Sequence, residues 1–422
     1  MKVLVIGRGG REHAIIWALK KSAKIKQIYC APGNAGIAQL ATNVDIGELE
    51  FDRLVAFAKG NGIDLVVVGP DDPLAAGIVD EFEAASIPVY GPRKNAAEIE
   101  GSKIFMKDLL RKYNIPTAKY ETFTDYDAAA AYLKQQVLPI VIKADGLAAG
   151  KGVSVCFTRE EADKALAETM VDKSFGAAGD KVVIEEFLEG QEMSILAFVD
   201  GETVLPMSPA QDHKQVFDND KGPNTGGMGT YSPLPHIAQS IIDESIENII
   251  KPTARAMVSE GRPFRGVLFA GLMITKDGPK TIEFNARFGD PETQVVLPRL
   301  ETDLLEIFLA SIDGTLDQVE MKWSDEAAVC VVLASGGYPG SYPKGLPISG
   351  LDAVDVPGAL VFHAGTALKD GQVVTNGGRV LGIVGRGAGI AEARASAYKA
   401  AESISFEGQI KRTDIAAKAL VQ

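Results

Sequence analysis

Short apolar segments alternate with amphipathic ones through the first hundred residues, and this alternation constrains the fold more than any other feature of the chain. Four segments have the length and composition of buried strands: residues 3–6, 28–30, 65–68 and 88–90. Three segments between them have helical spacing: residues 11–20, 54–58 and 78–85. Such alternation is typical of a parallel, doubly wound sheet, which binds ligands at the carboxyl ends of its strands. We therefore predict an α/β domain over residues 1–100.

A second region follows this domain and begins with a helix over 103–111. A compact unit of two strands, a helix and two strands is predicted next, with three of its strands at 140–143, 153–157 and 182–186 and its helix at 160–170. Long hairpin-like strands between 193 and 290 indicate a larger antiparallel sheet, which a helix over 303–311 closes. A strand at 327–333 opens a final α+β module that ends with a helix over 390–404.

The charge balance and the cysteine count exclude several classes of protein. The chain has 422 residues with 43 Lys and Arg against 56 Asp and Glu, and its net charge of −13 speaks against binding to a nucleic-acid backbone. No apolar run approaches the roughly 18 residues that span a bilayer, and the chain starts on a strand without a cleavable leader. The three cysteines are far apart and odd in number, which fits a reducing compartment. We expect a cytoplasmic protein without nucleic-acid or membrane partners.

A glycine-rich turn, GRGGREH at 7–13, lies between the first strand and the first helix. Its backbone N–H groups and the helix dipole can hold an anion, and Arg11 can bind one through two nitrogens. A dinucleotide fingerprint needs glycine where this chain has Glu12, so the turn indicates a monophosphate site rather than an NAD site. A tight turn without a ligand is equally consistent with these residues. The segment 31–36 follows the second strand and could close the same crevice.

A second glycine-rich segment, DGLAAGKG at 145–152, resembles a Walker A loop but lacks its first glycine and its Ser or Thr. It is predicted to be a mobile loop between two strands, with Lys151 inside it and Lys143 on the preceding strand. Such a loop can fold over a triphosphate and exclude water. A flexible hairpin with solvated lysines is the alternative.

The acidic segment 185–190 follows a Val/Ile strand at the junction with the larger sheet. Backbone groups there can pair with an adenine edge, and Glu192 can accept hydrogen bonds from ribose hydroxyls. A solvated acidic strand end is the commoner explanation for such a segment taken alone.

The hexapeptide IEFNAR at 282–287 carries the strongest chemical signal. On a strand, Glu283, Asn285 and Arg287 face the same side. Carboxylate and amide oxygens suit magnesium, and the arginine can stabilise a phosphoryl group during transfer. Two polar loops, QDHK at 211–214 and GPNTGGMG at 222–229, add candidate ligands for an amine, a phosphate or a carboxylate.

Eleven strings in chain order make the whole chain similar to the ATP-grasp superfamily and, within it, to the glycinamide ribonucleotide synthetase family. They are GRGGREH at 7–13, PGNAG at 32–36, EGSK at 100–103, IKADGLAAGKG at 142–152, IEEFLEG at 184–190, QDHK at 211–214, GPNTGGMGTYSP at 222–233, IEFNARFGDPETQ at 282–294, GGYPG at 336–340, HAGT at 363–366 and TNGGRV at 375–380. The chain shows no departure at a position expected to be catalytic.

The resemblance implies a reaction and a domain plan. Glycine attacks the γ-phosphate of ATP to form glycyl phosphate, and the amine of 5-phosphoribosylamine then displaces phosphate, in the second step of purine biosynthesis. It also implies Mg²⁺ or Mn²⁺, a monomer, and at most transient contact with neighbouring enzymes of the pathway. The implied regions are a phosphoribosylamine-binding domain, an ATP-grasp region with a lid subdomain, and a C-terminal α+β domain: 1–100, 101–325 with the lid at about 121–189, and 326–422.

The resemblance also implies a role for individual residues. The expected metal ligands are Glu283 and Asn285, and the expected catalytic residues are Arg287, Lys143 and Asp212. ATP is expected to be bound by Lys103, Lys143, Gly146, Gly150, Lys151, Gly152, Glu185, Glu186, Leu188 and Glu192. Glycine and phosphoribosylamine are expected to be bound by Gly10, Arg11, Glu12, Asn34, Asp212, Lys214, Gly226, Gly227, Met228, Gly229 and Arg379.

Three rival functions differ in what they require of the site. Another ATP-grasp ligase, such as a purine-pathway carboxylase, activates bicarbonate and does not need glycine. A non-catalytic nucleotide sensor does not need intact Glu283, Asn285 and Arg287. An NAD-dependent oxidoreductase is disfavoured by Glu12 in the first turn.

Overall fold

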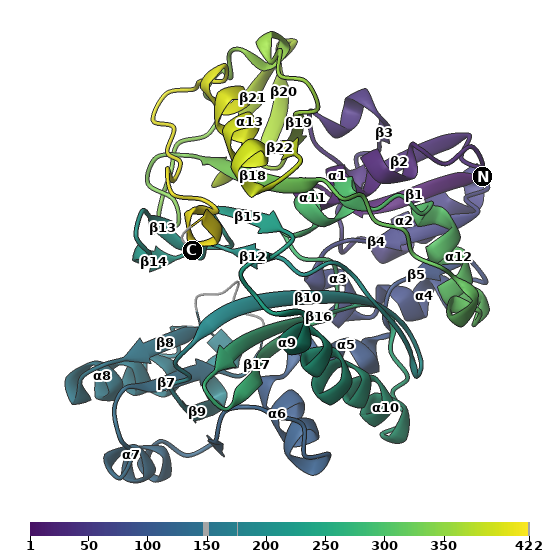
Figure 1. Ribbon diagram of the computed structural model, residues 1–422. Coiled ribbons are helices and arrows are strands. Elements are labelled where there is room, and N and C mark those ends of the chain that lie inside the picture. The colour runs from purple at the N-terminus through teal and green to yellow at the C-terminus, as the bar shows by residue number, and fades with distance from the viewer. Residues whose placement is uncertain (147–151, 175, 421–422) are drawn as a thin grey trace.

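The computed structural model describes residues 1–146, 152–174 and 176–420 (Figure 1). The N-terminal part contains a five-stranded parallel sheet in the order β3-β2-β1-β4-β5. Its strands are β1 (Lys2–Gly7), β2 (Gln27–Pro32), β3 (Thr42–Asn43), β4 (Leu65–Val68) and β5 (Val89–Tyr90). Its helices are α1 (Gly10–Leu19), α2 (Phe51–Asn61), α3 (Asp71–Ala76), α4 (Ile78–Ala84) and α5 (Lys94–Gly101). The predicted doubly wound α/β domain is confirmed, because all four residues of β4 are buried, as they are when helices cover both faces.

The centre of the molecule is an antiparallel sheet in the order β11-β10-β16-β17. Its strands are β10 (Gln191–Asp200), β11 (Thr203–Pro206), β16 (Arg265–Thr275) and β17 (Gly278–Asn285). Successive residues of β10 enter two different cores: Met193 and Ile195 join one apolar cluster, and Leu196 and Phe198 join another. The first face packs on α9 (Gln239–Ser245), a π-helical turn (Ile246–Ile250) and α10 (Lys251–Ser259), and the second on α12 (Leu304–Asp313). The predicted larger antiparallel sheet is therefore confirmed, buried on both faces.

The lid is a separate four-stranded sheet in the order β6-β9-β7-β8 with its own apolar core. It follows α6 (Lys103–Lys112) and contains β6 (Tyr120–Phe123), α7 (Tyr126–Lys134), β7 (Ile140–Ala144), β8 (Val153–Cys156), α8 (Arg159–Met170) and β9 (Val182–Glu186). The prediction of two strands, a helix and two strands was wrong in omitting β6 and α7. The sequence pattern of both elements is weak. β6 is a short edge strand without a clear apolar alternation, and α7 is a short alanine-rich helix whose N-cap is the Asp125 side chain.

The C-terminal part is α+β, as predicted, but its sheet also includes strands from earlier in the chain. The order is β12-β15-β18-β22-β19, and β15 (Gly229–Ser232) pairs antiparallel with β18 (Ala327–Ala334). The remaining elements are β12 (Gln211–Asp212), β13 (Gln215–Phe217), β14 (Lys221–Asn224), β19 (Leu360–His363), β20 (Thr366–Lys369), β21 (Gln372–Thr375), β22 (Arg379–Gly387) and α13 (Ile390–Glu402). Hydrogen bonds from β15 to β18 thus hold the polar loop 213–228 against the C-terminal domain.

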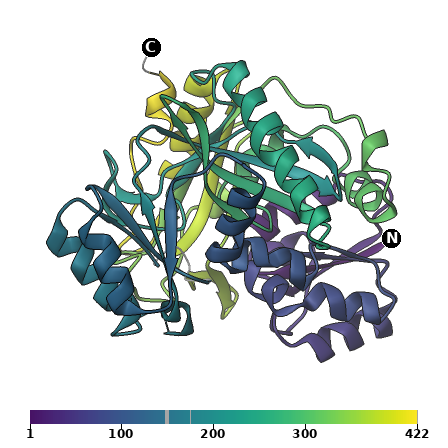
Figure 2. The same ribbon diagram turned by 90° about the horizontal axis from the view of Figure 1, so that it is seen from below.

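The lid and the N-terminal domain lie on opposite sides of the central region, as both views show (Figures 1 and 2). The parts of the molecule other than the lid share one core, because a single apolar cluster includes Leu4, Leu268 and Val329. Between α6 and the lid, Thr117 forms a bridge with Thr281 on strand β17 of the central sheet. Among the helices that the structure describes, none is long and apolar enough to cross a membrane.

Candidate active site

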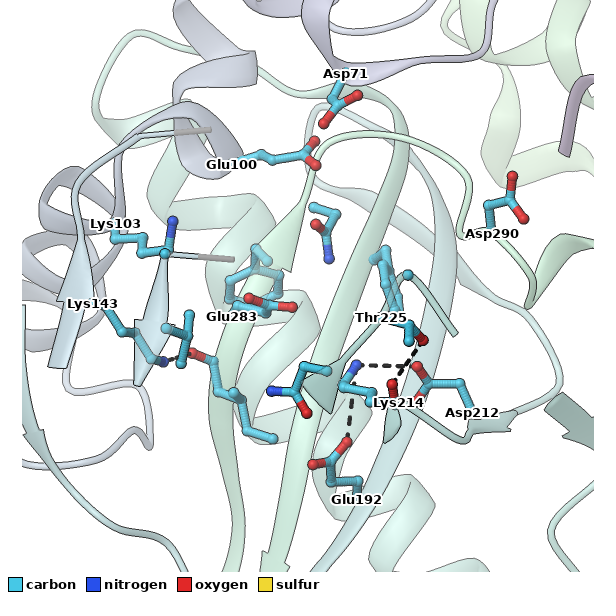
Figure 3. Close-up of a pocket in the computed structure, with 18 of the residues that line it drawn as sticks. Asp71, Glu100, Lys103, Lys143, Glu192, Asp212, Lys214, Thr225, Glu283 and Asp290 are labelled. Carbon is cyan, nitrogen blue, oxygen red and sulfur yellow. Dashed lines mark hydrogen bonds and ion pairs between the residues drawn. The ribbon is translucent and has the colours of Figure 1, made fainter. Parts of the chain in front are cut away.

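A cavity of about 770 Å³ lies where the lid, the central sheet and both terminal domains meet (Figure 3). Lys103 and Lys143 lie on one side of it, Glu283 in the middle, and Lys214 with its acidic neighbours on the other side. The predicted site residues that line it are Arg11, Lys103, Lys143, Gly146, Gly152, Glu185, Glu186, Leu188, Glu192, Asp212, Lys214, Gly226, Glu283, Asn285, Arg287 and Arg379. Residues from four separate parts of the chain therefore converge on one cavity large enough for a nucleotide and small substrates.

Lys103 stands at the start of α6, beside the glycine-rich segment. Its ammonium donates a hydrogen bond to the Gly146 carbonyl at 2.7 Å, and burial lowers its pKa. Asp145 accepts hydrogen bonds from the Ser102 hydroxyl and the Ile104 N–H, both at 3.1 Å. These contacts hold Asp145 and Gly146, which begin the glycine-rich segment, against the N-terminus of α6. The predicted residues Gly150 and Lys151 lie outside the described residues.

The carboxylate of Glu185 lies between two lysines. Its Oε1 pairs with Lys143 and its Oε2 with Lys107, whose ammonium is 2.5 Å away. Burial raises the pKa of Glu185, but the two ammonium groups outweigh it and hold the pKa below its usual range. The structure therefore gives the Glu185 side chain two cationic partners within the protein, which the sequence analysis did not foresee.

Strand β17 delivers the predicted metal ligands, and its end delivers Arg287. The register of β17 shifts against β16 next to Glu283, and the strand ends at Asn285, so simple alternation does not extend to Arg287 as predicted. The three side chains nevertheless line the same cavity. The Arg287 Nη2 lies 3.1 Å from Asn285 Oδ1 and 3.0 Å from the Glu100 carboxylate. The Glu283 side chain makes no hydrogen bond or ion pair with the residues that the structure describes, so its carboxylate is available to a ligand.

Lys214 lies between two carboxylates on the far side of the cavity (Figure 3). Its ammonium is 3.1 Å from Asp212 and 3.9 Å from Glu192. Glu292, on the loop before the short helix α11 (Thr293–Val296), also lines the cavity. Burial and the nearby Asp212 charge raise the pKa of Glu292 to about 7. This corner combines one cation with several acidic groups, as recognition of an amine substrate requires.

Two arginines converge on Asp290 where the N- and C-terminal domains meet. Arg379 donates hydrogen bonds to the carbonyls of Asp290 at 2.7 Å and Gly226 at 2.8 Å. Arg11 donates to the Phe288 carbonyl at 3.2 Å and forms an ion pair with Glu12 at 2.5 Å. Burial lowers the pKa of both arginines, but nearby carboxylates outweigh it. Glu12 and Asp290 raise the pKa of Arg11, and Asp290 raises the pKa of Arg379. Two fixed guanidinium groups suit a phosphate.

Six predicted substrate residues are absent from the cavity wall as the described residues form it: Gly10, Glu12, Asn34, Gly227, Met228 and Gly229. Glu12 is buried, accepts a hydrogen bond from the Gly9 N–H at 2.6 Å, and orients Arg11. It therefore caps α1 instead of facing the cavity.

Asn34 and Met228 also lie away from the cavity. Asn34 accepts hydrogen bonds from the Gly36 and Ile37 N–H groups and donates to the carbonyl of His363 at 2.8 Å, which joins the two terminal domains. Met228 is fully buried in an apolar cluster with Val216. Asn34 therefore stabilises the contact between the two terminal domains, and Met228 anchors the loop 222–229 in an apolar core.

The cavity also contains residues to which the sequence analysis gave no role. Glu100 and Asp71 approach one another at one end of it (Figure 3), and Tyr338 and Tyr342 come from the C-terminal domain. Glu100 and Tyr338 stand within strings that carried the family resemblance, EGSK and GGYPG, so a signal was present without a role attached. Glu292 likewise stands in the string FGDPETQ, which follows the predicted strand at 282–287.

Three family models match consecutive parts of the chain. They are the phosphoribosylglycinamide synthetase N domain over residues 1–100, the ATP-grasp (A) domain over 101–293 and the C domain over 328–418. A phosphoribosylamine–glycine ligase of Halalkalibacterium halodurans is 53% identical over 100% of this chain and 98% of its own length.

Two solved structures resemble this chain to different degrees. The crystal structure of the phosphoribosylamine–glycine ligase of Thermotoga maritima has a TM-score of 0.86 at 36% identity, covering 98% of this chain and 100% of that chain. The biotin carboxylase domain of a 2-oxoglutarate carboxylase from Hydrogenobacter thermophilus has a TM-score of 0.74 at 17% identity, covering 97% and 91%. The second likeness shows a shared fold only.

Proposed function

The chain belongs to the phosphoribosylglycinamide synthetase family and is an ATP-dependent ligase that joins glycine to phosphoribosylamine in purine biosynthesis, and we propose that its central cavity does so through glycyl phosphate. A carboxylate is unreactive toward amines at neutral pH, whereas an acyl phosphate carries a good leaving group. The protein then needs no nucleophile of its own. Positioning and charge neutralisation supply the catalysis.

The nucleotide lies between the lid and the central sheet in this proposal. Lys103 and Lys143 bind its phosphates, and Glu186 and Leu188 present backbone groups to the adenine edge. Val155 of β8 and Met273 of β16 are apolar residues of the cavity wall. Gly146 and Gly152 line the cavity beside these lysines, in keeping with their predicted role next to the phosphates. Glu185 acts through the lysines that it pairs with.

Glu283 and Asn285 fit a divalent cation. They supply one carboxylate and one amide oxygen on a single strand, and the Glu283 carboxylate has no partner among the described side chains. Few protein ligands, completed by phosphate oxygens and water, suit Mg²⁺, and Mn²⁺ accepts the same donors. Such an ion neutralises charge on the phosphates of ATP. Arg287, held by Glu100, faces the same region and stabilises the phosphoryl group in transfer.

The substrates occupy the remaining parts of the cavity. Arg11 and Arg379 bind the phosphate of phosphoribosylamine, with the loop 226–229 beside them. Asp212, Glu192 and Lys214 bind the amino and carboxylate groups of the small substrates. Glu12 supports this subsite through its ion pair with Arg11, and Asn34 supports it through its hydrogen bond to the His363 carbonyl, while Gly10 begins α1 beside Arg11. We assign residues 1–100, 101–325 and 326–422 as the three domains of a cytoplasmic monomer.

One observation carries this proposal: a single cavity is lined by two lysines suited to nucleotide phosphates, by a carboxylate and an amide suited to a divalent cation, and by two arginines suited to a phosphate. These residues are Lys103 and Lys143, Glu283 and Asn285, and Arg11 and Arg379. The test is ADP release from Mg-ATP with glycine and phosphoribosylamine supplied singly and together. Turnover only with both supports the ligase. Turnover with bicarbonate in place of glycine would contradict the substrate assignment, and ATP binding without any turnover would favour a sensor.

A further inference from the structure

Lys107 is a buried cation next to the nucleotide part of the cavity, although it does not line that cavity. It lies on α6 with a side chain that is 0% exposed. Its ammonium is 2.5 Å from Glu185 Oε2 and donates a hydrogen bond to the Thr117 hydroxyl at 2.8 Å. Because a buried charge is costly without a partner, a lysine at this position requires a reason that packing alone does not provide.

The partners of Lys107 connect it to the reaction centre. Glu185, its ion-pair partner, contacts Lys143 through the other carboxylate oxygen. The Lys143 ammonium also donates to the Ile282 carbonyl at 3.2 Å, and Thr117 donates to the Thr281 carbonyl at 2.8 Å. Both branches therefore end on β17, just before the proposed metal ligand Glu283. The contacts join α6, the lid and strand β17.

The charges of this group explain why two lysines are present. The charges of Lys143 and Glu185 alone sum to zero, so this pair without Lys107 would attract a polyphosphate weakly. With Lys107 the group carries one net positive charge, and only Lys143 and Glu185 of the three line the cavity. Within a poorly solvated site, one unit of charge changes the attraction for a polyanion substantially.

We propose that Lys107 is a positioning residue that neutralises Glu185 from behind, so that Lys143 presents a full positive charge to the phosphates of the nucleotide. The proposal rests on the proposed function, because it takes the cavity to hold ATP. Lys107 touches no substrate in this arrangement and acts only through Glu185. Burial lowers the pKa of Lys107, but the Glu185 carboxylate counteracts that effect.

Nucleotide binding to the full chain, without glycine or phosphoribosylamine, tests this role. Calorimetric titration with adenosine, ADP and ATP compares wild type with Lys107→Met. We expect about tenfold weaker ATP binding, a smaller loss for ADP and no change for adenosine, because the missing charge acts on phosphates. Lys112→Met is the matched control, since Lys112 lies on the same helix but is 63% exposed and paired with Glu260.

A double variant separates the charge effect from a packing defect. Lys107→Met with Glu185→Gln removes both buried opposite charges and leaves Lys143 with its own, so ATP affinity should return to within about threefold of wild type. This variant also decides the matter if Lys107→Met alone does not fold. Unchanged ATP binding in Lys107→Met, equal losses for ATP and adenosine, or no recovery in the double variant would each overturn the proposal. Wild-type turnover is assayed separately, so failure of the ligase assignment is seen independently.

Discussion

Glu100 holds Arg287 at the point where strand β17 ends. Its Oε1 lies 3.0 Å from Arg287 Nη2, and its Oε2 accepts a hydrogen bond from the Ala286 N–H at 2.8 Å. The Glu100 side chain is 8% exposed, and burial raises its pKa while Arg287 lowers it. One carboxylate from α5 therefore fixes both the backbone and the guanidinium directly after Asn285.

Glu100→Gln should lower kcat by about 10- to 100-fold while changing the KM for ATP little, because a misplaced arginine loses its effect mainly in the transition state. Steady-state kinetics with all three substrates measures this. Glu98→Gln is the control, since Glu98 lies on the same helix and pairs with Arg262 away from the cavity. Arg287→Ala should give a similar loss in kcat, and the double variant should be no worse than Arg287→Ala. Fully additive losses would show that Glu100 does not act through Arg287.

Glu283→Gln should lose at least about 100-fold in kcat, because the amide is a much poorer ligand for a hard divalent cation than the carboxylate. Its melting temperature should stay close to that of wild type, since the carboxylate makes no hydrogen bond or ion pair with the described side chains. Kinetics across a magnesium titration and thermal melting measure both effects. Glu202→Gln, an exposed carboxylate in the β10–β11 turn, is the control. Near-normal turnover in Glu283→Gln would rule out the metal assignment.

The sequence predicted those site residues whose side-chain chemistry and local strand period together fix their place. Glu283 and Asn285 are two residues apart on β17, so their position on one side of that strand follows from the two-residue period of a strand. The parallel N-terminal sheet was predictable for a similar reason, because continuous apolar strands alternated with helices.

What the sequence could not show depends on contacts between distant segments. Nothing near Glu185 indicates that Lys107, from a helix nearly eighty positions earlier, would pair with it. Asn34 is polar and follows a strand, as a ligand residue would, yet its hydrogen bonds join it to the C-terminal domain. The pairing of β15 with β18 likewise spans a hundred residues, and local periodicity contains no information about such partners.

Stability should fall in mild acid because of a buried histidine pair between the terminal domains. The Nδ1 of His13 accepts a hydrogen bond from the His363 N–H at 2.8 Å, so His13 is held neutral there. Burial lowers the pKa of His13 to about 3 and that of His363 to about 4. The unfolded chain takes up these protons near pH 6.5 and the folded chain does not, so each histidine should cost about 1 kcal/mol between pH 6.5 and 5.5.

Thermal or denaturant unfolding at about pH 7.5 and about pH 5.5 measures this loss. His13→Asn keeps an acceptor close to the position of Nδ1 but cannot take up a proton. Its stability should therefore fall less between the two pH values than that of wild type. An identical pH dependence in the two proteins would show that His13 does not contribute.

Glu292→Gln should stabilise the protein at high pH while leaving it unchanged in acid. Glu292 is 3% exposed, and its pKa is raised to about 7 by burial and by Asp212. A carboxyl with a raised folded pKa costs stability as the pH rises from about 4.5 to about 7, and the full cost is present above that.

The glutamine has no charge to bury, so at about pH 8 the variant should gain up to about 3 kcal/mol, and the gain should vanish near pH 4.5. Denaturant unfolding at a series of pH values measures this difference. Turnover should fall at the same time, because an active-site group whose burial costs stability is kept for its chemistry. A variant that is less stable than wild type at high pH would show that Lys214 and Arg287 already compensate the Glu292 charge.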